Sequence, residues 1–364
     1  MLRSRTLLFG ALVFSLSLAD LATAEPADDR IANETPGLRA TPTTTSQDWP
    51  ELVIMAGPYA RYREIVQSAA KIPPNSAEDL ERLMDALAAF DGAKLSRSFR
   101  AYTIIQAMQT PAFANGILKW KRLYDHKGLI RNLKINSAYA MQMPGYGEAE
   151  QHVLQSIRDD AQMVLLAGGI YKDLAYSLQR QKWGTRVRGG KALRLATLRN
   201  AHLAKQTFPI RILASLKQGY TLQPRTTPTS PLQTTELATN SPNPSLFKAL
   251  VSGIGPGPAN ASTVSQGGPR LQADPSYALE LQSIMATAAL HILEPGTPYA
   301  SPIPTRSNPD ILGECVDWAR LHLNQCVSAT RFVYEDSFCI ARHQLKDSGR
   351  CIAEFLDGHH QATH

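Results

Sequence analysis

Apolar residues recur at three- and four-residue steps over most of the chain, and this is the pattern of amphipathic helices. Strand signals are scarce: only residues 208–213 could form a strand, and we favour a helix there as well. Ser76-Ala77-Glu78-Asp79 has the outline of a capping box, which would open a helix over the apolar positions up to Phe90. We therefore predict an all-α fold, with further helices over residues 58–70, 95–109, 112–124, 149–183, 191–203 and 277–293.

The longest helical pattern, residues 149–183, contains Gly168-Gly169 near its middle. Paired glycines inside a helix indicate either a kink or a close contact with a neighbouring helix. The sequence does not decide between these two readings.

A second helical region follows near the C-terminus and carries all four cysteines. Asn308-Pro309 predicts a helix start, because Asn suits the N-cap and Pro the first helical position. Apolar residues from Leu312 to Val327 then share one helix face. Residues 338–356 give the second helix of a hairpin, with an expected interruption at 347–349.

The spacing of the cysteines selects one of three disulfide pairings. Cys315 and Cys326 lie eleven residues apart in one helix, roughly 16 Å along its axis, which is too far for a disulfide. In an antiparallel hairpin, the residue numbers of two facing positions add up to the same value, the index sum, along the whole hairpin. The residue numbers of Cys315 and Cys351 add up to 666, and those of Cys326 and Cys339 to 665. We predict Cys315–Cys351 and Cys326–Cys339. A zinc site is disfavoured because the cysteines lack the close spacing of known zinc modules.

Composition divides the chain into segments. Residues 220–275 are rich in Pro, Thr, Ser, Asn and Gly, which predicts a low-complexity linker or disordered loop. We expect a signal peptide (1–24), a flexible leader (25–48), a helical domain with a basic face (49–219), this linker, a C-terminal helical domain with two disulfides (276–356), and a histidine-containing tail (357–364). Whether the two helical domains pack together is left open.

The N-terminus predicts export. Arg3 and Arg5 precede an apolar run from Leu7 to Leu18, and Ala22-Thr23-Ala24 fits a cleavage site. Disulfides persist in oxidising compartments, so we expect a periplasmic or secreted protein. No later stretch is apolar enough to predict a transmembrane segment in the mature chain.

The most distinctive chemical feature is an uneven charge distribution. The chain carries a formal net charge of +7, and residues 174–235 contain no acidic residue. A surface of this kind attracts polyanions at long range. We predict an anion-binding face that would take an anionic envelope component such as lipopolysaccharide, anionic lipid or a cell-wall polymer. The residues expected to form it are Arg180, Lys182, Arg186, Arg188, Lys191, Arg194 and Arg199.

One other reading of the same basic residues stays open. The face could be a solvated surface with no partner, which favours solubility. A second basic patch, in residues 119–134, could also contribute; it comprises Lys119, Lys121, Arg122, Lys127, Arg131 and Lys134.

An alternative function is an envelope hydrolase that acts on peptidoglycan or another glycan. Glu148, Glu150, His152, Asp159 and Asp160 form the densest group of acid–base residues, and glycoside hydrolysis needs two carboxylates flanking one bond. The stretch Ala138-Tyr-Ala-Met-Gln-Met-Pro-Gly-Tyr-Gly147 resembles an element of lytic transglycosylases. The chain has no glutamate between Glu81 and Glu148, so the catalytic acid which that resemblance requires is missing, and we assign no family.

A third reading is a scaffold that assembles with itself or a membrane partner through apolar helices between Ala101 and Met143. We predict no catalytic residue, cofactor or metal site, and the protein partner is unknown. His359, His360 and His364 beside Asp357 could bind a transition metal, but we interpret them as a tail beyond the last helix.

Overall fold

The computed structural model describes residues 49–203, 208–221, 271–296, 298 and 310–356. The expected signal peptide, leader and histidine tail lie outside these residues, as does most of the expected linker. The regular elements of the described part are all helices, apart from two isolated β-bridges, which confirms the all-α prediction. Its helices are α1 (Glu51–Lys71), α2 (Ala77–Ala88), α3 (Gly92–Met108), α4 (Pro111–Leu123), α5 (His126–Ile135), α6 (Tyr146–Leu178), α7 (Lys191–Asn200), α8 (Ile210–Tyr220), α10 (Ala278–Leu293), α11 (Ile311–Ala329), α12 (Val333–Cys339) and α13 (Ser348–Ala353).

Shorter elements complete the fold. Three 3₁₀ turns are η1 (Ser137–Gln142), η2 (Ala201–Leu203) and η3 (Pro275–Tyr277). The π-helical stretch η4 (Ile340–Asp347) joins α12 to α13 without a break. The expected interruption at residues 347–349 is therefore wrong, because the chain widens its helical turn before this point and continues into α13. Within the described residues, no helix is long and apolar enough to cross a bilayer.

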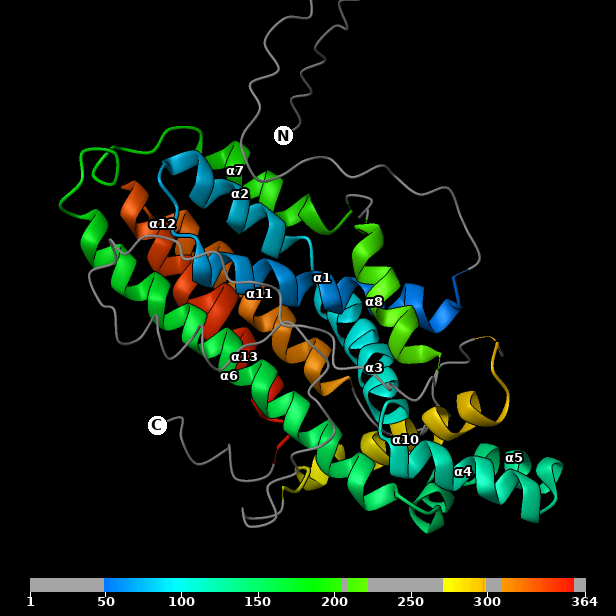
Figure 1. The fold of residues 1–364 in the computed structure, drawn as a ribbon. Coiled ribbons are helices and arrows are strands. Elements are labelled where there is room, and N and C mark those ends of the chain that lie inside the picture. Colours follow the sequence, from blue (N-terminus) through cyan, green and yellow to red (C-terminus); the bar gives the residue numbers. More distant parts are fainter. Residues whose placement is uncertain (1–48, 204–207, 222–270, 297, 299–309, 357–364) are drawn as a thin grey trace, which may run out of the picture. The chain divides into compact units, whose positions relative to one another are not determined.

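The long helix α6 is the element on which the C-terminal helices pack (Figure 1). Gly168 lies where α6 meets η4, and a side chain at this position would collide with Lys346 and Ala341. Gly349 of α13 lies close to Leu165 of α6, where a Cβ would come within 3.0 Å of the leucine side chain. Gly168 thus lies at a close contact between α6 and η4, which is one of the two alternatives that the sequence left open.

Both predicted disulfides are present. Cys315 pairs with Cys351 and Cys326 pairs with Cys339, each with Cα atoms 5.7 Å apart. They join α11 to the antiparallel segment formed by α12, η4 and α13. The constant index sum of a helical hairpin therefore gave the correct pairing.

The helices before and after the expected linker share one hydrophobic core. Phe355, near the end of the described chain, packs against Phe99 of α3 and Tyr277, with ring centroids 5.9 and 4.7 Å apart. Gln344 of η4 donates to the carbonyl oxygen of Met84 in α2 at 2.7 Å. The described helices accordingly belong to one compact unit.

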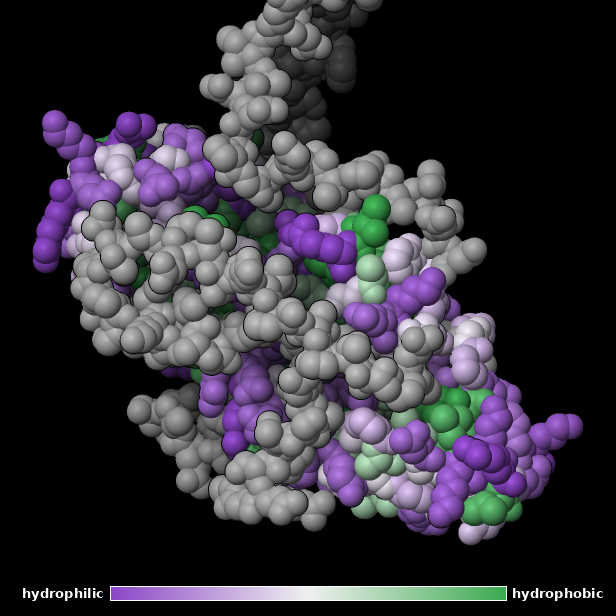
Figure 2. Space-filling model, viewed as in Figure 1, coloured by the Kyte–Doolittle hydropathy of each residue, from purple (hydrophilic) through white to green (hydrophobic). Residues whose placement is uncertain are grey.

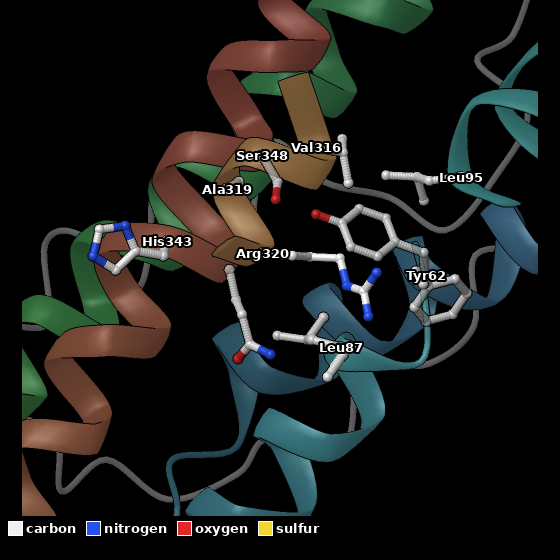
Figure 3. Close-up of a pocket in the computed structure, with 11 residues that line it drawn as sticks. Tyr62, Leu87, Leu95, Val316, Ala319, Arg320, His343 and Ser348 are labelled. Carbon is white, nitrogen blue, oxygen red and sulfur yellow. The ribbon is translucent and has the colours of Figure 1, made fainter. Parts of the chain in front are cut away.

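A small void lies in this core (Figure 3). It has a volume of about 20 Å³ and is lined by residues of α1, α2, α3 and the C-terminal hairpin, among them Tyr62, Leu95 and Val316. That volume holds about one water molecule. The void is a packing feature and too small for an organic ligand.

Several helix boundaries differ from the sequence prediction. α1 begins at Glu51, seven residues before Pro58, because Leu52, Val53 and Ala56 are buried against neighbouring helices. α11 begins at Ile311, and its N-cap is Asp310, which accepts from the Gly313 amide at 3.1 Å. Asn308 and Pro309, where the sequence predicted the start, lie outside the described residues. In contrast, Ser76 caps α2 as predicted, since its hydroxyl accepts from the Asp79 amide.

The helix α5 has no counterpart in the sequence prediction. Its polar composition hides it, because only Leu129, Ile130 and Leu133 of its ten residues are buried. Asp125 opens the helix and accepts from the amides of Lys127 and Gly128. This N-cap is the local signal that could have located it.

Candidate functional site

The predicted anion-binding residues lie on one continuous stretch, residues 180–199, which we call the basic segment. It starts in the turn that follows α6 and ends in the last turn of α7. Gly184 makes the turn possible, because a Cβ at this position would overlap the carbonyl group of Leu178. Gly190 then adopts a left-handed conformation, φ 66°, immediately before α7. These glycines fold the basic segment back along the C-terminal hairpin.

Backbone hydrogen bonds fix the basic segment to the connection between α11 and α12. The amide of Arg188 donates to the carbonyl oxygen of Arg331 at 2.8 Å, and Val333 donates to Arg186 at 3.2 Å. Tyr334 also donates to Gly184 at 3.0 Å. These bonds surround the isolated antiparallel β-bridge between Val187 and Phe332 and hold the turn against the hairpin.

Two of the seven predicted residues turn inward. Arg188 donates from Nε to Oδ2 of Asp336 at 2.6 Å, and Arg194 donates to the same oxygen at 3.1 Å. The other carboxylate oxygen of Asp336 accepts from the Thr330 hydroxyl at 3.3 Å. Both arginines also form ion pairs with Glu81 of α2. Arg188 and Arg194 thus anchor the basic segment instead of presenting charge to a ligand.

Burial governs the electrostatics of this anchor. Asp336 is 0% exposed, and burial raises its pKa, while Arg194, Arg188 and Thr330 oppose the rise. Burial likewise lowers the pKa of Arg188 and of Arg194, and Asp336 counteracts this in both cases. Arginine starts from a pKa so high that both guanidinium groups remain charged at neutral pH.

The other five predicted residues are exposed: Arg180, Lys182, Arg186, Lys191 and Arg199. Figure 2 shows hydrophilic side chains projecting where α6 ends and the chain turns towards α7. Arg331 is exposed beside them, and its backbone is bonded to Arg188. Sequence reasoning missed Arg331, because a position more than a hundred residues away shows no proximity signal in a single sequence.

One acidic side chain moderates the charge of this face. The pKa of Glu78 in α2 is lowered, first by hydrogen bonds at its own backbone and at Ser76, and also by Arg186 and Arg188. Glu78 therefore offsets part of the positive field around Arg186. The exposed charges at Arg180, Lys182, Lys191 and Arg199 are separate from this interaction.

Neighbouring residues of the charge run do not extend the face. Tyr220 is buried, and its hydroxyl accepts from the Gly296 amide at 3.0 Å. Trp183 is partly buried against the core. Arg211 forms an ion pair with Glu64, and the Lys217 ammonium lies 5.2 Å from the centre of the Trp49 ring.

The second basic patch is also exposed, on α4 and α5. Five of its six residues are exposed: Lys119, Arg122, Lys127, Arg131 and Lys134. The sixth, Lys121, donates to the carbonyl oxygen of Leu293 at 2.7 Å. This patch matches the basic segment in number of exposed charges, so the two surfaces can be compared directly.

The acid–base group considered for a hydrolase is dispersed. Glu148 and Asp159 are exposed, and Asp159 accepts from Gln155 at 2.8 Å. Asp160 is buried, where it accepts from the Tyr59 hydroxyl at 3.0 Å and from Nε of Arg63 at 2.7 Å. His152 is partly buried, and burial lowers its pKa.

Glu150 of that group lines a cavity. The cavity has a volume of about 440 Å³ and lies between η1, the start of α6 and the segment 271–282. Tyr146 donates from its hydroxyl to Glu150 at 3.4 Å. Among the described residues that line this cavity there is no second carboxylate. The pair of acids that glycoside hydrolysis requires is therefore not assembled there.

The apolar helices considered for self-assembly are mostly core. Residues 101–108 are all buried, and α3 contributes Ile104, Ile105 and Met108 to the interior. The large apolar side chains that stay exposed between 101 and 143 are Leu123, Tyr124, Ile135 and Met141.

Comparison of the chain with protein families, with curated proteins and with solved structures found no match. The function must therefore be argued from the residues themselves.

Proposed function

We propose that this chain is an exported, non-catalytic protein that binds an anionic component of the cell envelope through the exposed side chains of the basic segment. One observation carries the proposal. The basic segment presents Arg180, Lys182, Arg186, Lys191 and Arg199 to solvent, while Arg188 and Arg194 hold it in place through a fully buried aspartate. A preformed face loses less conformational freedom on binding than a flexible one.

Two features support a location outside the cytoplasm. Both disulfides join the hairpin helices, and such bonds persist where the environment is oxidising. The N-terminal sequence predicts a signal peptide. We propose a periplasmic or secreted protein, where lipopolysaccharide, anionic lipid and acidic cell-wall polymers are the available polyanions.

Binding assays with the purified, oxidised protein test this proposal. Three probes separate the ligand sources: lipopolysaccharide, phosphatidylglycerol vesicles and isolated murein. We expect retention by at least one probe at low salt and loss of retention as the salt concentration rises, because salt screens charges at exposed sites. Absence of salt-sensitive binding to all three probes would contradict the proposal.

We do not propose the hydrolase or the scaffold. The carboxylates that a hydrolase would need are dispersed over the surface and the core. The scaffold would need a continuous apolar surface, whereas most of the residues considered for it are buried.

A further inference from the structure

The cysteine-bearing hairpin also gathers two histidines and an aspartate. His322 of α11, His343 of η4 and Asp347 of η4 each place a potential ligand atom within 4.8 Å of the other two. The two imidazole rings have centroids 5.7 Å apart. Nδ1 of His343 lies 2.8 Å from Oδ2 of Asp347. From this geometry we infer a binding site for a divalent transition-metal ion, formed by His322, His343 and Asp347.

The ligand types fit such an ion. Imidazole nitrogen and carboxylate oxygen bind Zn²⁺, Cu²⁺ and Ni²⁺, and three protein ligands leave further positions for water. Zn–N and Zn–O bonds of about 2.0–2.2 Å place tetrahedral ligand atoms roughly 3.4 Å apart. His322 is exposed, so its side chain can rotate to bring its ring nitrogen from within 4.8 Å of the other two ligand atoms to the shorter distance of a bound site. An ion can also reach it from solvent.

The disulfides hold the ligands in register. His322 and His343 have the same index sum as Cys326 and Cys339, so the antiparallel hairpin places them opposite each other, one helical turn from that bond. His343 and Asp347 are four residues apart and share a helix face. Both residues lie in a π-helical stretch. This fits the assignment, because π-helical turns are uncommon in proteins and many of those that occur lie at functional sites.

The surroundings orient the carboxylate. Arg350 lies 3.4 Å and Arg342 4.0 Å from Oδ1 of Asp347, which leaves Oδ2 directed at His343. Outer contacts of this kind fix a ligand's orientation in metal sites. In Figure 3 the His343 ring lies apart from Tyr62 and Leu95, away from the apolar core.

No metal site was predicted in this hairpin, because its histidines form no closely spaced motif. His322 and His343 nevertheless face each other in the register that pairs Cys326 with Cys339. The tail histidines His359, His360 and His364, which lie outside the described residues, must be replaced by alanine in every protein used to test the site. Otherwise their binding could mask that of the hairpin.

Calorimetric titration of the oxidised, tail-substituted protein with Zn²⁺, and absorption titration with Co²⁺, test the inference. We expect saturation at one ion per chain. His322→Ala should lower the affinity at least about tenfold, as should Asp347→Asn. Gln325→Ala, an exposed change on the same helix, should leave the affinity unchanged.

Two results would overturn the site: no saturable binding in the tail-substituted protein, or an affinity that is equal in the His322→Ala, Asp347→Asn and Gln325→Ala proteins. The exposed position of His322 makes its replacement harmless to the fold, and circular dichroism checks this. Trp318 gives a second signal, since its ring centroid lies 6.2 Å from that of His322. Bound Cu²⁺ should quench its fluorescence, and Trp318→Phe should remove that part of the quenching without changing the Zn²⁺ affinity.

Discussion

Nε of Arg188 lies 2.6 Å from Oδ2 of Asp336, a carboxylate with no solvent exposure. The two residues are 148 positions apart in the chain. Their contact joins the basic segment to the disulfide-linked hairpin. It adds to the three backbone hydrogen bonds between the turn and the hairpin and to the contact of Arg194 with the same carboxylate.

Replacing Asp336 should therefore destabilise the protein strongly. Asp336→Asn removes the buried carboxylate that pairs with Arg188 and Arg194 and leaves Glu81 as their ionic partner, and breaking a buried ion pair costs about 3–5 kcal/mol. Urea unfolding measures the loss. Asp159→Asn, at an exposed position, is the control and should change stability by less than about 0.5 kcal/mol. A loss at Asp336 that is no larger than at Asp159 would show that the anchor contributes little.

The two disulfides should stabilise the fold unequally. Cys315–Cys351 closes 36 residues and Cys326–Cys339 closes 13. The loop-entropy relation then gives about 4 kcal/mol for the first and about 3 kcal/mol for the second. We expect the paired Cys315→Ala and Cys351→Ala protein to unfold at lower urea concentration than the Cys326→Ala and Cys339→Ala protein. The reverse order would mean that local packing, and not loop closure, sets the contribution of each bond.

Acid should destabilise the protein partly through His291. This side chain is 3% exposed, and burial lowers its pKa from 6.5, against a weaker opposing effect of Glu51. As the pH falls below about 6.5, the unfolded chain therefore binds a proton that the folded chain does not, and the free energy of unfolding decreases. His152, whose pKa burial also lowers, acts in the same direction.

A variant isolates the contribution of His291. Burial raises the pKa of Asp160 and of Glu280, and these groups act in the opposite direction, so the total pH profile mixes several effects. His291→Gln should show a smaller loss of stability between pH 7.5 and pH 5.5 than the unaltered protein. An identical loss in both proteins would exclude His291 as a contributor.

Local patterns predicted much of this fold. Ser76 correctly predicted the start of α2, and the positions of the cysteines predicted the disulfide pairing. Long-range partners were beyond reach: a single sequence cannot show that Arg188 and Arg194 meet Asp336, so all seven basic residues were expected on one binding face. Asn308 and Pro309 are good helix-start residues, yet Asp310 caps α11 because its carboxylate reaches the Gly313 amide. The proximity of His322 and His343 could have been predicted from the sequence, because they face each other in the same register as Cys326 and Cys339.

The central claim is that the exposed residues of the basic segment bind an anionic envelope component. Retention on immobilised lipopolysaccharide across a salt gradient tests it most directly, with two variants of equal net charge. One carries Gln at Arg180, Lys182, Arg186, Lys191 and Arg199; the other carries Gln at Lys119, Arg122, Lys127, Arg131 and Lys134 of the second patch. We predict that the first variant elutes at clearly lower salt and that the second elutes close to the unaltered protein. Equal shifts in both variants, or a shift in the second alone, would contradict the claim.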